Sequence, residues 1–150
     1  MPGRGPVVIL SLLAGLFFLR VLGQALVAFT GVTFLPAMSE WYSGLLPYPL
    51  LLPVQVVILA LQAKISLDLT RQRGVFVVPR PRAGRGLQIL AMLYFLAMVV
   101  RYALTMAWYP ERRWLGTGTI PIVFHWVLAA YLFTLGRCLA RTPVAERSAG

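Results

Sequence analysis

Four long runs of apolar residues, separated by short polar segments, occupy most of the chain. They cover residues 6–32, 48–68, 87–108 and 119–139. Each run is long enough to cross the ~30 Å hydrocarbon layer of a bilayer as a helix, which takes roughly 20 residues. The pattern therefore predicts an all-α, polytopic integral membrane protein, a bundle of four transmembrane helices forming a single domain over residues 1–150.

Composition supports this prediction. Hydrophobic residues make up 59% of the chain and charged residues 12%, with a mean hydropathy of +0.79. A soluble domain of this size could not bury so much apolar surface. The start of the chain, with Arg4 followed by an apolar stretch, resembles a signal peptide, but the apolar character continues past Gln24. We therefore expect an uncleaved first span.

Basic residues predict the orientation of the spans. Residues 70–86 form an expected irregular loop with five arginines, and its Lys64 and Asp68 neighbours are spaced to pair on one helix face. Loops rich in Lys and Arg stay in the cytoplasm, so we expect both termini and this loop to be cytoplasmic, in the inner membrane of a bacterium. These arginines should contact lipid headgroups, the alternative being an acidic cytoplasmic partner. They are Arg71, Arg73, Arg80, Arg82 and Arg85.

The net charge of +10 therefore indicates anionic lipid as a partner, and we expect no nucleic acid partner. Cys138 is the single cysteine, which excludes an internal disulfide, and we expect it to be a small membrane-facing or packing residue. Small residues four apart could allow close helix approach. Two such pairs are Ser11 with Gly15 and Gly136 with Ala140.

Polar side chains within the spans are costly in a bilayer and point to function. With ~1.5 Å rise per residue, Arg20 and Arg101 each lie ~21 Å from the cytoplasmic edge of their spans. Gln55 and His125 lie ~10 Å and ~9 Å below the opposite edge. The four residues are thus predicted to share one plane in the outer half of the bilayer, with Gln24 close to them.

Two arginines at one depth need something to offset their repulsion. Glu40 and Glu111, in the outer loops, could fold inward and form a structural network with Arg20 and Arg101. Each arginine could instead extend to the interface. The third alternative is a pocket for an anionic group, such as a phosphate or carboxylate, because the planar guanidinium can bind two oxygens. The candidate ligand-binding residues are Arg20, Gln24, Gln55, Arg101 and His125.

His125 is the only histidine, so it could supply one haem ligand, with the second from Met98, Met106 or another subunit. We predict no cofactor and no metal site, because haem needs this additional ligand and no cluster of metal-binding residues is evident.

The sequence favours a non-enzymatic protein: an accessory subunit, or a lipid- or anion-binding module. Membrane lipids are the expected partners, together with other membrane subunits or a second copy of the chain. One alternative is a small enzyme that acts on a lipid-linked or apolar substrate, with His125 as its catalytic residue and Arg20 and Arg101 as an anion clamp. The other is an anion transport or haem-binding subunit.

Overall fold

The computed structural model describes residues 4–41, 47–108 and 119–141, and these residues contain helices and no strands. Four helices are long and apolar enough to cross a membrane, which confirms the all-helical fold and the four long apolar helices in the described residues. A short helix, α2, lies between the first and second of them. The elements are α1 (Arg4–Thr30), α2 (Met38–Trp41), α3 (Tyr48–Arg71), α4 (Pro81–Trp108) and α5 (Thr119–Ala140).

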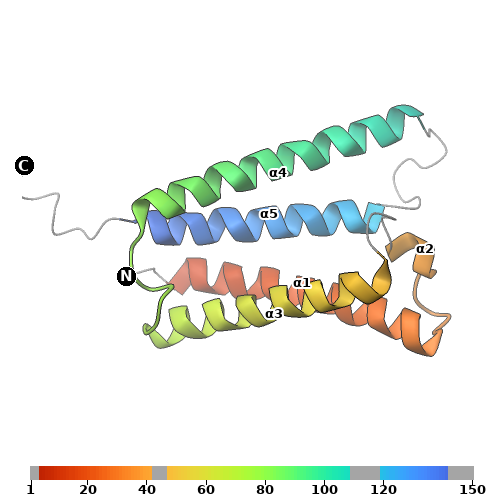
Figure 1. Ribbon diagram of the computed structural model, residues 1–150, viewed down its shortest axis with the longest axis horizontal. Coiled ribbons are helices and arrows are strands. Elements are labelled where there is room, and N and C mark those ends of the chain that lie inside the picture. The colour runs from red at the N-terminus through yellow and green to blue at the C-terminus, as the bar shows by residue number, and fades with distance from the viewer. Residues whose placement is uncertain (1–3, 42–46, 109–118, 142–150) are drawn as a thin grey trace, which may run out of the picture.

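The long helices form a bundle with one side open. In Figure 1, α5 lies between α4 and the pair formed by α1 and α3. Helix α1 packs against α3 and α5, and α5 packs most extensively against α4, whereas no Cα atom of α3 lies within 8 Å of one in α4. We call the end where α1 begins and α5 ends the terminus end, and the opposite end, where α2 contacts α1 and α5, the α2 end.

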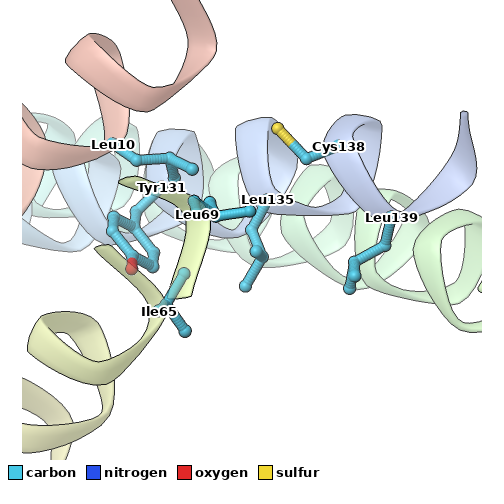
Figure 2. Close-up of a cluster of buried hydrophobic side chains, with 7 residues drawn as sticks. All are labelled: Leu10, Ile65, Leu69, Tyr131, Leu135, Cys138 and Leu139. Atoms are coloured by element: carbon cyan, nitrogen blue, oxygen red, sulfur yellow. The ribbon is translucent and has the colours of Figure 1, made fainter. Parts of the chain in front are cut away.

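The hydrophobic core lies toward the terminus end. It joins α1, α3 and α5, and Phe76 and Val77 of the connection between α3 and α4 pack against it. Figure 2 shows its buried members, which are Leu10, Ile65, Leu69, Tyr131, Leu135, Cys138 and Leu139. The expectation that Cys138 is a packing residue is confirmed. The core and the connection therefore pack the long helices together at the terminus end.

Helix α4 meets α5 through glycine. A Cβ at Gly84 would lie 2.6 Å from the carbonyl oxygen of Gly136 and 2.5 Å from the backbone nitrogen of Ala140, so only glycine allows this approach. The predicted role of Gly136 and Ala140 in close helix contact is confirmed. Gly15 has no atom of another segment within 4 Å of its Cβ position, so the structure gives no such role to the Ser11 and Gly15 pair.

The predicted irregular loop through Gly86 is wrong for residues 81–86, because α4 begins at Pro81 rather than at Leu87. Proline suits a first helical turn, since its φ is fixed and its missing N–H would have no partner there. The Gly84 contact with α5 then holds the turn in place. All five arginines of the segment are exposed. The expected pair between Lys64 and Asp68 is confirmed, with Nζ 3.3 Å from the carboxylate.

Candidate functional site

Arg20 on α1 is the charged side chain that the described part of the chain buries most completely, at 8% exposed. Gln24 lies one helical turn further along, on the same face of α1. Nη1 of Arg20 donates to Oε1 of Gln24 at 2.8 Å, and Nη2 donates to the backbone carbonyl of Trp41 at 3.2 Å. Both acceptors are neutral, so these bonds hold the guanidinium in place without neutralising its charge.

Helix α2 supplies the backbone acceptor. The Trp41 carbonyl also accepts a bond from Nε2 of Gln24 at 3.3 Å, and the Trp41 indole N–H donates to the carbonyl of Pro36 at 2.9 Å. The indole lies directly against α1, where a Cβ on Gly23 would be 2.7 Å from the ring. A glycine at this position therefore lets α2 approach closely enough to bind the two polar side chains of α1.

Gln55 extends this network to α3. Its Nε2 donates to Oε1 of Gln24 at 3.1 Å, so the Gln24 oxygen accepts from both Gln55 and Arg20. This shared acceptor determines the orientation of both amides. If the oxygen and nitrogen of the Gln24 amide were exchanged, its NH₂ group would face the donors of Arg20 and Gln55. Two buried atoms of this network have no partner among the described residues, namely Nε of Arg20 and Oε1 of Gln55. One is a donor and the other an acceptor.

A cavity of about 180 Å³ adjoins this network. Each of the four long helices contributes one polar side chain to its wall: Arg20, Gln55, Tyr94 and His125. The volume is well above the ~10–15 Å³ that admits one water, and it suits a small headgroup. The rest of the wall is apolar and consists of Phe17, Leu51, Val54, Ile58, Pro121, Phe124 and Leu128.

Tyr94 and His125 form a second polar pair on this wall. The Tyr94 hydroxyl is hydrogen-bonded to Nδ1 of His125, and the rings meet edge to face with centroids 5.6 Å apart. When the hydroxyl donates to Nδ1, the ring hydrogen lies on Nε2, which can then donate to a ligand. The proposed haem ligands Met98 and Met106 do not line the cavity that contains His125.

Tyr94 was missed by the sequence analysis because the start of α4 was placed too late. Counted from Pro81, Tyr94 lies ~20 Å along the helix, close to the depth predicted for the polar plane. Arg101 then lies ~30 Å along, about two turns beyond Tyr94 toward the α2 end. Tyr94, rather than Arg101, is thus the polar residue of α4 on the cavity wall, and the shared depth of Arg101 stays a prediction.

Arg101 is half-buried and absent from the cavity wall, and its side chain makes no hydrogen bond to any residue in the described ranges. It lies within electrostatic reach of Tyr94 and His125.

Glu40 is half-buried and forms no ion pair with Arg20, since Lys64 with Asp68 is the one ion pair among the described residues. Glu111 lies outside the described residues. The acceptor that α2 gives to Arg20 is thus a carbonyl and not the predicted carboxylate.

The structure therefore unites Arg20, Gln24 and Gln55 in one hydrogen-bonded network and places Arg20, Gln55 and His125 around one cavity. Within residues 4–41, 47–108 and 119–141, no three His, Cys, Asp or Glu side chains gather as metal ligands would. Comparisons of the chain with protein-family models, curated proteins and solved structures give no match.

Proposed function

We propose that this chain is an integral membrane protein that binds an anionic group in the cavity beside Arg20. The observation that carries the proposal is a buried guanidinium with neutral hydrogen-bond partners on the wall of a cavity. A charge within a membrane is expensive unless it is paired or hydrated, so an arginine in this position favours an anionic ligand.

The charge distribution supports an orientation in the membrane. The exposed arginines of the segment between α3 and α4 gather at the terminus end, and Trp41, Tyr48 and Trp108 lie toward the α2 end. Basic segments stay in the cytoplasm, and aromatic rings collect at the interfaces. The terminus end is then cytoplasmic, in the inner membrane of a bacterium, and the cavity opens in the opposite half of the bilayer.

The electrostatic gain from such a ligand is large enough to matter. An anion ~4 Å from the guanidinium gains about 4 kcal/mol at an effective dielectric constant of ~20. The Nε–H of Arg20, which has no partner among the described residues, and the Nε2–H of His125 would donate to its oxygens. Arginine suits this role because its charge persists in an apolar setting and its donors are arranged in a rigid plane.

Lipid retention tests the proposal. The protein is reconstituted in phosphatidylcholine bilayers containing phosphatidylglycerol, extracted with an uncharged detergent, and its bound lipid is identified by native mass spectrometry. Wild type should retain the anionic lipid, and Arg20→Gln should lose it. Arg137→Gln, at an exposed position on α5 outside the arginines expected to contact headgroups, is the matched control and should behave as wild type. Equal retention by Arg20→Gln and wild type would refute the proposal.

The hydrogen bond between Tyr94 and His125 favours a second candidate, a small enzyme that acts on a lipid-linked substrate. A histidine beside an anion clamp could move a proton to or from a reacting group, and the tyrosine would position its ring. In this candidate, His125→Gln abolishes turnover of the bound lipid while retention of the lipid persists. If the bound lipid is recovered chemically unchanged from wild type, the binding module stands and the enzyme does not.

A further inference from the structure

The cavity combines three properties that together restrict what can bind there. It has a positive charge that no described carboxylate neutralises, a buried acceptor with no partner among the described residues, and an apolar wall on the open side of the bundle. We propose that its ligand is a membrane lipid whose headgroup carries both an anionic oxygen and a hydroxyl group, and whose acyl chain leaves the cavity between α3 and α4. This inference rests on the anion site proposed above and names the class of ligand.

The need for a hydroxyl follows from Gln55. This side chain is 3% exposed, its NH₂ group is bound to Gln24, and its Oε1 has no partner among the described residues. A buried carbonyl oxygen without a hydrogen bond is costly, and an anionic oxygen beside it would be repelled. A ligand that gives an anionic oxygen to Arg20 and a hydroxyl hydrogen to Gln55 satisfies both unpartnered atoms, whereas an anion without a hydroxyl satisfies one.

The need for an apolar chain follows from the shape of the bundle. Helices α3 and α4 both contribute to the cavity wall, yet their backbones do not approach within 8 Å. Val54 of α3 lines the cavity and is also 49% exposed, so the apolar wall continues onto the outer surface of the bundle. In a bilayer that surface faces acyl chains. A lipid can therefore place its headgroup beside Arg20 while its chain stays in the hydrocarbon layer.

Lipid selectivity tests the hydroxyl. Phosphatidylglycerol has an anionic oxygen and hydroxyls, and phosphatidic acid has both as the monoanion present at mildly acidic pH, while phosphatidylmethanol is anionic and has no hydroxyl. In competition within phosphatidylcholine nanodiscs, wild type should retain the first two over phosphatidylmethanol by about tenfold, a factor typical of one buried hydrogen bond. Gln55→Met should remove this preference. Equal retention of all three lipids overturns the inference and leaves the anion site intact.

Obstruction of the opening tests the path of the chain. Val54→Trp places a bulky ring on the wall without altering the polar network, and Val57→Trp is its control, since Val57 is exposed and does not line the cavity. Lipid retention should fall in the first variant and persist in the second, with unchanged helical content by circular dichroism. Retention by both variants overturns the inference. Binding of inorganic phosphate that depends on Arg20, without retention of any lipid, also overturns it but upholds the anion site. If the protein retains none of the lipids and does not bind inorganic phosphate, both the inference and the anion site are rejected.

Discussion

Two buried glutamines with opposite surroundings give a sharp test of the polar network. Gln24 is fully buried and uses both ends of its amide, whereas Gln62 on α3 is 3% exposed and neither of its amide atoms has a partner among the described residues. Replacement by leucine removes the amide from each site and retains most of the volume. We expect Gln24→Leu to destabilise the protein and Gln62→Leu to stabilise it or leave it unchanged.

The magnitudes follow from the bonds that are lost. Gln24→Leu removes three hydrogen bonds, one of them to a charged group. Hydrogen bonds within membrane proteins average ~0.6 kcal/mol, and bonds to charged groups reach about 1.5–3 kcal/mol. The sum is a loss of about 3–4 kcal/mol in the free energy of unfolding. Gln62→Leu breaks no bond within the described structure, and it removes the ~1–3 kcal/mol penalty of a buried polar group without a partner.

The assay is unfolding in mixed micelles, with increasing sodium dodecyl sulfate in an uncharged detergent, followed by circular dichroism and tryptophan fluorescence. Gln24→Leu should unfold at a lower fraction of sodium dodecyl sulfate than wild type, and Gln62→Leu at the same or a higher fraction. If the two variants lose equal stability, the difference in hydrogen bonding between these sites is not the cause. The hydrogen bonds of Gln24 would then contribute no more to the stability of the protein than the unbonded amide of Gln62.

Three further predictions concern other parts of the fold. Gly84→Leu should separate α4 from α5 and destabilise the protein by ~2 kcal/mol or more in the same assay, since overpacking costs about 1–3 kcal/mol, whereas the exposed Gly86→Leu should not. Tyr94→Phe should move the ¹⁵N resonances of the His125 ring, because Nδ1 loses its partner; unchanged resonances would contradict the pair. Arg85→Cys should react with a membrane-impermeant maleimide from the cytoplasmic side alone, and labelling in intact cells would reverse the proposed orientation.

The sequence predicts much of this fold because bilayer thickness constrains helix length. The apolar pattern places the start of α3 at Tyr48 and of α5 at Thr119, as observed. It misses the start of α4, since residues 81–86 are basic and glycine-rich and their helix depends on the contact between Gly84 and α5. Hydropathy along the chain cannot predict that tertiary contact.

Part of the candidate site was also predictable from the pattern of apolar and polar residues. Arg20, Gln24 and Gln55 are conspicuous as polar residues in apolar runs, and the structure joins them. On α4 the sequence analysis selected Arg101, whereas the residue on the cavity wall is Tyr94. The acceptor from α2 had no signal in the sequence, because a backbone carbonyl is present at every residue and only the fold selects the one at Trp41.

That carbonyl makes the turn between the first two spans part of the cavity's chemistry, although no residue of α2 lines the cavity. One oxygen at the end of a four-residue helix restrains both Arg20 and Gln24. Substitutions in the Pro36–Trp41 segment would therefore have the same phenotype in a genetic screen as substitutions of Arg20 or Gln24. Displacement of α2 would free two donors beside the cavity, Nη2 of Arg20 and Nε2 of Gln24.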